Sequence, residues 1–177
     1  LTYGAAGPLP SEKLEYYYDS LGMLDGMTGS GSYVGDAIYS PYGEVLQLAM
    51  GNTIGHTMYQ TLAYENGTRR LQQSRIDRQA IAGTDEITDY TYDPAGNPTK
   101  VAATLLGGTK DTQCYTYGER AQLREAWTPT SGDCATTKTQ AGLGGPAPYW
   151  QSYTHDVAGN ITSIVDRTTT TSRTTTM

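Results

Sequence analysis

Phenylalanine is absent from this chain of 177 residues, and cysteine and histidine occur only twice each. No apolar run approaches the roughly 20 residues that a membrane-spanning helix needs, so the sequence predicts no membrane span. Only 17% of the residues are charged, and the formal net charge is -6 without a long basic run. This balance argues against nucleic acid as the main partner, because surfaces that bind nucleic acid are basic.

Motifs for catalysis and cofactor binding are also missing. His56 and His155 lack the HxxxH or HxxE spacing of a metal site, and the cysteines lack a CxxC spacing. There is no GxSxG sequence for a hydrolase nucleophile, and the glycine-rich stretch 29–35 lacks the lysine of a phosphate-binding loop. We therefore expect no catalytic residue, no cofactor and no metal ion, and we do not expect the chain to be an enzyme.

In place of phenylalanine the sequence has 15 tyrosines, together with many threonines and 21 glycines. Tyrosine and threonine both suit a pleated surface that is partly exposed to water. A chain of this length can form one domain with a core of its own. The composition therefore favours β-strands over helices.

A short motif recurs along the chain: two aromatic residues with one residue between them, then aspartate, then glycine three residues after the aspartate. The clear copies are YYYDSLGML (16–24), YTYDPAGNP (90–98) and YTHDVAGNI (153–161), and weaker copies lie at 39–48, 62–71 and 115–123. Most copies are roughly 22 to 28 residues apart, which is in the range of stacked repeat architectures. The residues that anchor the six copies are Tyr18, Tyr42, Tyr64, Tyr92, Tyr117 and His155.

The aspartate and glycine of the motif predict a tight turn. Aspartate at the first corner, proline at the second and glycine at the fourth is the signature of a type I turn. A glycine with positive φ at the fourth position makes the bulge of a three-residue hairpin loop. Asp19, Asp93 and Asp156 recur with the repeat, so we interpret them as acceptors for turn amides and not as paired catalytic carboxylates.

Residues two apart in a strand face the same side, so the paired aromatics predict rows of rings across neighbouring hairpins. One hairpin is not stable alone in water, so the hairpins must stack. The predicted fold is all-β, built from stacked antiparallel β-hairpins. The residues that define the repeat are Tyr16, Tyr18, Asp19, Gly22, Tyr90, Tyr92, Asp93, Gly96, Tyr115, Tyr117, Tyr153, His155, Asp156 and Gly159.

Three segments stand apart from the regular pattern. Residues 128–148 are rich in Gly, Pro and Thr and predict a long insertion loop within a repeat region that covers 1–166. The Thr-rich segment 167–177 predicts a disordered tail. Residues 68–83 fit a short amphipathic helix or a return strand followed by the next hairpin, and the surrounding periodicity favours the strand.

Cys114 and Cys134 have two interpretations. A disulfide between them would tether the insertion loop to the strand before Tyr115, and it would stabilise the fold by roughly 3 kcal/mol in the loop-entropy model. The alternative is a pair of free thiols in a cytosolic fragment. We favour the disulfide, which points to a secreted or surface location.

The copies at 16–24, 90–97 and 153–161 resemble the YD repeat of Rhs and WapA-type bacterial toxins and of teneurins, and the resemblance extends over residues 14–166. It implies a β-hairpin ribbon that spirals into a hollow shell. The chain departs from the repeat where Tyr42 and Tyr117 are followed by glycine, where Glu65 follows Tyr64, and where His155 replaces tyrosine. The motif that ends the toxin shells is absent.

The resemblance implies a non-catalytic segment of a shell that encloses or presents a C-terminal toxin domain in contact-dependent competition. Its partners would be further repeats and the toxin domain of the same parent protein, and it would be secreted or lie at the cell surface or cell wall of a bacterium. The alternative is a surface adhesion or carbohydrate-binding module that uses the tyrosine-rich face. Tyr149, Trp150 and Trp127 are candidates to hold sugar, although buried packing is the favoured role for them.

Overall fold

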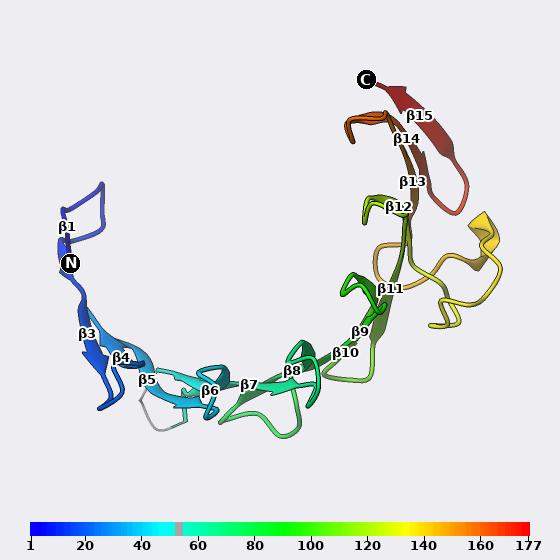
Figure 1. The fold of residues 1–177 in the computed structure, drawn as a ribbon. Helices are drawn as coiled ribbons and strands as arrows, with labels where there is room; N and C mark the ends of the chain where they lie inside the picture. Colours follow the sequence, from blue (N-terminus) through cyan, green and yellow to red (C-terminus); the bar gives the residue numbers. More distant parts are fainter. Residues whose placement is uncertain (52–54) are drawn as a thin grey trace. The chain divides into compact units, whose positions relative to one another are not determined.

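The computed structural model describes residues 1–51 and 55–177, and nearly all of its regular structure is β-strand (Figure 1). The one helical segment among the described residues is the short 3-10 turn η1 (Gln140–Gly142). The strands are β1 (Thr2–Tyr3), β2 (Glu12–Lys13), β3 (Glu15–Tyr18), β4 (Leu24–Thr28), β5 (Ser32–Tyr39), β6 (Val45–Met50), β7 (Met58–Tyr64), β8 (Leu71–Arg78), β9 (Glu86–Tyr92), β10 (Pro98–Leu105), β11 (Lys110–Tyr117), β12 (Leu123–Trp127), β13 (Trp150–His155), β14 (Ile161–Arg167) and β15 (Ser172–Thr176).

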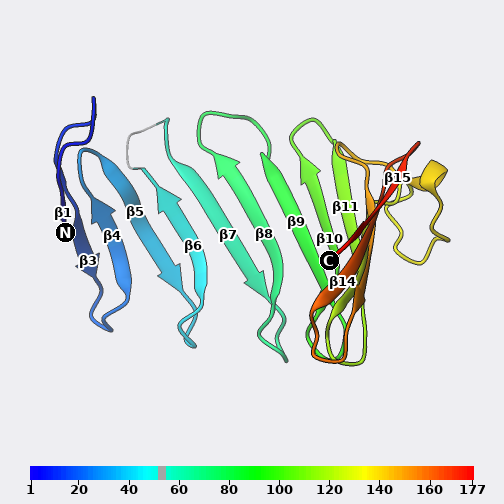
Figure 2. The same ribbon diagram turned by 90° about the horizontal axis from the view of Figure 1, so that it is seen from above.

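The strands follow one another in the sheet in the order of the sequence. Strands β3 to β15 form an antiparallel sheet of 13 strands, and β1 and β2 form a separate small pair. The chain divides into two compact units, unit 1 (Leu1–Ile87) and unit 2 (Thr88–Met177). Within each unit the strands form a simple meander of hairpins (Figure 2). The predicted all-β fold of stacked antiparallel hairpins is confirmed.

The segment 68–83 contains strand β8 and no helix, as the periodicity favoured. Its residues pair with β7, for example Ile76 with Gln60. The arginines of this strand lie on its solvated surface, where Arg75 Nε is 2.8 Å from Asp77 Oδ2 and Arg78 Nη2 is 2.6 Å from Asp85 Oδ1.

The Thr-rich tail differs from the disordered segment that its composition predicts. Residues Ser172–Thr176 form β15 and pair with β14, with Thr175 opposite Ile164. A turn from Thr168 to Thr171 reverses the chain, and the Thr168 N–H donates to the Thr171 carbonyl at 2.9 Å. All five residues of β15 are exposed, so β-branched side chains and backbone pairing hold the strand without burial.

The buried hydrophobic residues lie mainly in unit 2. Five are buried in the part of the chain that the structure describes, of which Ala49 alone belongs to unit 1. In unit 2, Cys114, Trp127 and Leu143 form a cluster, and Cys134 and Trp150 pack against it. Elsewhere the sheet is a single layer.

The cover over this cluster is the loop between β12 and β13, which projects from one side of the sheet (Figure 1). Cys114 in β11 and Cys134 in the loop form a disulfide, with their Cα atoms 5.5 Å apart. The Lys100 ammonium donates to the Gly132 carbonyl at 2.8 Å, which holds a second point of the loop. Of the two interpretations of the cysteines, the structure has the disulfide. Among the described residues, no helix is long and apolar enough to cross a membrane.

Candidate functional site

The recurring turn is built around the aspartate of the motif, and Asp93 shows its geometry. The Asp93 N–H donates to the Asn97 carbonyl at 2.9 Å, and the Gly96 N–H donates to the Asp93 carbonyl at 3.0 Å. The Asp93 carboxylate accepts the Asn97 N–H and the Asn97 side-chain amide, both at 2.9 Å. Gly96 has φ of +97°, which confirms the left-handed glycine that the sequence predicts.

The turn at Asp156 repeats this arrangement. Its carboxylate accepts N–H groups from Ala158 and Asn160 and the Asn160 side-chain amide, each at 2.9 Å. Gly159 has φ of +95°. Neighbouring strands shift register next to this turn, between Thr154 and His155, as a bulged hairpin requires.

The first copy lacks the asparagine but keeps the turn. The Asp19 carboxylate accepts the N–H groups of Leu21 and Met23, both at 2.8 Å. Gly22 has φ of +79°, and its N–H donates to the Asp19 carbonyl at 3.1 Å. Each aspartate therefore binds its own turn, and the structure places the three at separate hairpins.

In two of the three turns these hydrogen bonds favour the ionised carboxylate. The Asn97 amide and backbone N–H hold the pKa of Asp93 below its usual range, and Asn160 does the same to the pKa of Asp156. Both carboxylates thus stay ionised as acceptors. Within the described ranges, no group of three or more His, Cys, Asp or Glu side chains could hold a metal ion.

Three further turns keep a left-handed residue before the return strand and change the side chains. In 40–44 Ser40 replaces aspartate, and its hydroxyl accepts the N–H groups of Tyr42 and Glu44 at 3.2 Å. In 118–122 Gly118 stands at the first corner, and Ala121 takes the left-handed position with φ of +57°. The turn 65–70 is one residue longer, and Arg69 is left-handed there with φ of +61°.

The turn 40–44 corrects one anchor of the predicted repeat. Because Ser40 opens the turn, the aromatic residue that precedes it is Tyr39, the last residue of β5. Tyr42, which the sequence indicates as the anchor, lies inside the turn and is 76% exposed. Tyr39 and Tyr42 are only three positions apart and both lie close to Gly43. Either tyrosine therefore fits the spacing of the repeat, and the sequence alone did not distinguish them.

Three of the tyrosines that precede the turns connect their hairpin to the one before it. The Tyr39 hydroxyl donates to the Leu24 carbonyl at 2.7 Å, and Leu24 is the first residue after the preceding turn. Tyr64 donates in the same way to Val45 at 3.0 Å. The anchors thus act through a hydroxyl as well as through a ring.

The same contact recurs in unit 2, where the Tyr117 hydroxyl donates to the Pro98 carbonyl at 2.9 Å. Sequence reasoning assigned these tyrosines to ring packing and missed the hydrogen bond. The signal for it was the absence of phenylalanine from a chain with so many aromatic strand positions. Phenylalanine has the ring but cannot donate to a backbone carbonyl.

The other tyrosine of each pair lies two residues earlier on the strand. In unit 2 the Tyr115 hydroxyl donates to Gln113 Oε1 at 2.8 Å, and the Tyr153 hydroxyl donates to Gln151 Oε1 at 2.6 Å. Burial raises the pKa of Tyr115 and of Tyr153, and burial also raises the pKa of Tyr149, whose hydroxyl is 3.2 Å from Gln113 Oε1. These phenols stay neutral and structural.

In unit 1 the first copy is open to solvent. Tyr16 and Tyr18 lie on β3, exposed by 40% and 62%. Tyr90 and Tyr92 lie on β9 and are half-buried. The tyrosine row is therefore unevenly covered along the sheet.

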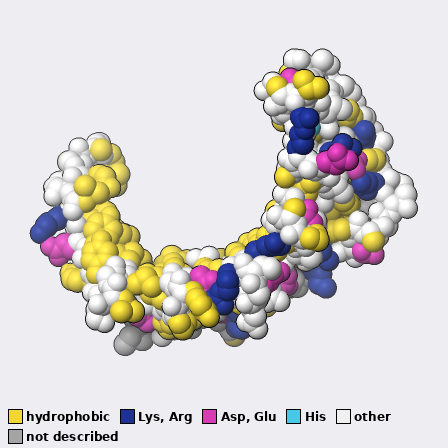
Figure 3. Space-filling view, in the orientation of Figure 1, with side chains coloured by type: hydrophobic (Ala, Val, Ile, Leu, Met, Phe, Trp, Pro, Cys, Tyr) yellow, Lys and Arg dark blue, Asp and Glu magenta, His cyan; other side chains and the backbone are white. Residues whose placement is uncertain are grey.

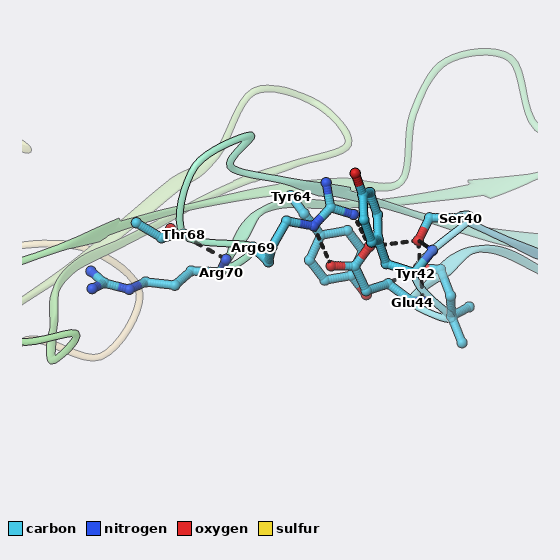
Figure 4. A network of polar contacts seen from close by, with 8 residues as sticks. Ser40, Tyr42, Glu44, Tyr64, Thr68, Arg69 and Arg70 are labelled. Atoms are coloured by element: carbon cyan, nitrogen blue, oxygen red, sulfur yellow. Dashed lines mark hydrogen bonds and ion pairs between the residues drawn. The ribbon is translucent and has the colours of Figure 1, made fainter.

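Two neighbouring turns of unit 1 are joined by the polar network in Figure 4. Arg69 forms an ion pair with Glu44, with its Nε 2.7 Å from Oε1, and its guanidinium lies 4.4 Å from the centre of the Tyr42 ring. The Ser40 hydroxyl donates to the other oxygen of Glu44 at 2.6 Å. Arg69 thus occupies the left-handed position that is usually glycine, and its side chain fills the space between the two turns.

The tryptophans proposed as sugar platforms are covered by protein groups. Trp127 is only 3% exposed, and the Lys138 ammonium lies 4.3 Å from its ring centre. The Arg167 guanidinium lies 4.3 Å from the ring centre of Trp150, whose Nε1 donates to Glu125 at 3.1 Å. With these ring faces occupied, packing is the role that the geometry supports for both.

Comparison with known proteins finds similarity at the level of structure only. No family model and no curated protein matches the chain. The crystal structure of TcdB2-TccC3 aligns with a TM-score of 0.73 and 23% identity, over 93% of this chain and 9% of that chain. A crystal structure of TcdB2-TccC3-Cdc42 aligns with a TM-score of 0.73 and 22% identity, over 93% of this chain and 9% of that chain.

The Tc holotoxin pore of Photorhabdus luminescens aligns over 93% of this chain and 8% of that chain, with a TM-score of 0.71 and 22% identity. At these identities the likeness shows a shared fold. The chain spans less than a tenth of the length of the chains that it matches.

Proposed function

We propose that this chain is a non-catalytic wall segment of a secreted or cell-surface toxin of the Rhs and WapA type. In the parent protein, further hairpins of the same kind continue the sheet, and the wall encloses or presents a C-terminal toxin domain in contact-dependent competition between bacteria. The observation that carries the proposal is the fold likeness to toxin complex structures over 93% of the chain, combined with the recurring aspartate-glycine turn.

The way the hairpins are joined supports a structural role. The same hydrogen bond, from a tyrosine hydroxyl to a backbone carbonyl, joins three hairpins to the hairpin before them, through Tyr39, Tyr64 and Tyr117. A sheet joined in this way can be lengthened by repetition. The recurring carboxylates accept hydrogen bonds from the backbone N–H groups of their own turns. Polar side chains that serve their own backbone leave little for catalysis, and we therefore propose no enzymatic activity.

Limited proteolysis of the full parent protein tests the proposal. If the wall encloses a cargo, the C-terminal domain should resist protease in the native protein and become sensitive when turns of the wall carry Gly96→Val and Gly159→Val. A parent protein with Gly67→Val, at a turn glycine whose φ is not positive and whose surroundings are open, is the matched control. Equal cleavage of the C-terminal domain in all three proteins would contradict enclosure.

A second candidate, a surface adhesion or carbohydrate-binding module, rests on exposed rings in unit 1. Hydrophobic side chains gather over β3 to β5 in Figure 3, and exposed members of these strands include Tyr16, Tyr17, Tyr18 and Tyr33. Flat aromatic rings can stack on sugars. Saturable binding on a glycan array that Tyr18→Ala abolishes and Tyr18→Phe retains would favour this candidate over the first.

A further inference from the structure

Two departures from the repeat meet at one place in unit 2. Gly118 stands where other turns have aspartate, glutamate or serine, and His155 stands where other copies have tyrosine. Each departure removes a group that is present elsewhere. Gly118 has no carboxylate for its turn, and the His155 ring has no hydroxyl for the backbone of the previous hairpin.

The arginine at position 124 occupies the space that Gly118 leaves. A Cβ atom at Gly118 would lie 2.9 Å from Arg124 Nε, so any side chain there would displace the guanidinium. The tyrosine rule predicts that the residue at 155 would reach the Leu123 carbonyl. Across residues 1–51 and 55–177, no hydrogen bond joins His155 to Leu123, because the imidazole is shorter than a phenol.

The result is a cleft of about 310 Å³ between the turn 118–122 and strand β13. Its lining residues are Gln122, Arg124, Tyr153, Thr154 and His155. This volume is at the lower end of the range for small-ligand sites. The two turns that flank the cleft are held together by Arg120, whose Nη1 donates to the Val157 carbonyl at 2.6 Å.

The groups around the cleft favour an anion. None of its five lining residues is acidic, and Arg124 forms no ion pair in the described part of the chain. An adjoining hollow of about 260 Å³ shares Gln122, Arg124 and His155 with the cleft and is also lined by Glu119 and Asp156. The Asp156 oxygens accept hydrogen bonds from their own turn. An unpaired guanidinium with amide and imidazole groups beside it can bind an oxyanion through two parallel hydrogen bonds.

We propose that this cleft is a binding site for one oxyanion group, a carboxylate or a phosphate. Arg124 supplies the charge and the paired donors, while Gln122 and His155 flank the ligand. The group can belong to a small molecule or to an acidic side chain of a polypeptide. The site depends on the two departures from the repeat and is separate from the structural role of the wall.

NMR titration of the 177-residue chain tests the site, with inorganic phosphate, succinate and a short glutamate-containing peptide as separate probes. We expect saturable shifts of the Arg124 Nε–H and of the backbone amides of 153–155. Arg124→Gln should weaken binding by at least about tenfold. The matched control Arg173→Gln removes the same charge from exposed β15 and should leave the affinity within about twofold, since the exposed arginine lies on another strand.

His155→Tyr provides a test in the opposite direction. It restores the hydroxyl of the repeat, so it should abolish binding while the melting temperature stays equal or rises. Preference for phosphate or succinate over the peptide assigns the site to a small molecule, and the reverse preference assigns it to a polypeptide. The proposal is wrong if no probe gives saturable shifts, or if Arg124→Gln and Arg173→Gln weaken binding equally.

Discussion

The space between neighbouring turns is closed in unit 1 and open in unit 2. In unit 1 Arg69 reaches from one turn to Glu44 and Tyr42 of the turn before it. In unit 2 the corresponding space between 118–122 and 156–160 is a cleft beside Arg124 and His155. At both places the hairpin turn closes with backbone hydrogen bonds and a left-handed residue, although the turn 65–70 is one residue longer. The side chains at the turns are therefore free to differ, because backbone hydrogen bonds and the left-handed residue define the hairpin.

The two units differ in their cover as well. In unit 2 a disulfide-bonded loop packs its Leu143 against Cys114 and Trp127 of the sheet, whereas Ala49 is the one buried hydrophobic residue among those described in unit 1. Strands that lack a second layer must depend on neighbour-to-neighbour contacts. Both units share those contacts, and unit 2 adds a local core to them.

The largest expected effect comes from removing the disulfide. Cys114→Ala with Cys134→Ala opens a loop with a sequence separation of 20, and it should lower the free energy of unfolding of unit 2 by about 3 kcal/mol. Both tryptophans, Trp127 and Trp150, belong to unit 2. Tryptophan fluorescence during urea unfolding therefore reports unit 2 selectively.

Reduction of the unmodified chain is the control for this variant. It should shift the fluorescence transition as far as the double substitution does, and it should not affect the doubly substituted chain. An unchanged fluorescence midpoint after reduction would show that the loop does not stabilise unit 2 through the disulfide.

The next effect comes from the left-handed turn position. Gly96→Val places a β-branched side chain at a φ of +97°, and it should destabilise the chain by roughly 1 kcal/mol or more. Gly67→Val is the control, because Gly67 is a turn glycine without positive φ or close neighbours. Equal losses from the two substitutions, measured by urea unfolding, would refute the bulged-turn assignment.

A smaller effect should appear in both units when the connecting hydroxyls are removed. Tyr39→Phe in unit 1 and Tyr117→Phe in unit 2 each leave the ring and delete one hydrogen bond, at an expected cost of about 1 kcal/mol. Tyr42→Phe should change stability little, because no hydrogen bond from the Tyr42 hydroxyl is present in the described residues. A loss in only one unit would show that the units are joined by different rules.

The smallest effect is the pH dependence of the turns. The pKa values of Asp93 and Asp156 are lowered in the folded chain by their asparagine partners. The stability that they contribute is complete above their unfolded pKa, about 3.9, and is lost as the pH falls through the lower folded values. The melting temperature should fall between pH 5 and pH 2, and it should fall less in Asp93→Asn with Asp156→Asn. An identical fall in both proteins would show that these carboxylates are not linked to folding.

The sequence was sufficient for the features that recur. Aspartate followed three residues later by glycine predicted the turn at Asp19, Asp93 and Asp156, and alternation with threonine and tyrosine predicted strands. These signals are local, since a type I turn and its bulge are decided by a few adjacent residues. The segment 68–83 was correctly predicted to contain a strand, because the repeat spacing of the hairpins on either side favours one there.

Features that depend on contacts between hairpins could not be obtained in this way. The hydroxyl of Tyr39 and the carbonyl of Leu24 are brought together by the pairing of different strands, and no motif records that distance. The cleft at His155 likewise needs Gly118 of the preceding hairpin. The prediction of a disordered Thr-rich tail was wrong because two signals conflict for threonine. A low-complexity segment favours disorder, whereas the β-propensity of threonine favours a strand.

The hydroxyl contacts between hairpins have a direction. In each of them the donor tyrosine, Tyr39, Tyr64 or Tyr117, comes later in the chain than the carbonyl that it meets. During synthesis the acceptor is therefore added to the chain before its donor. Each new hairpin can therefore dock onto the hairpin made before it, so a sheet of this kind can be assembled one hairpin at a time in the order of synthesis.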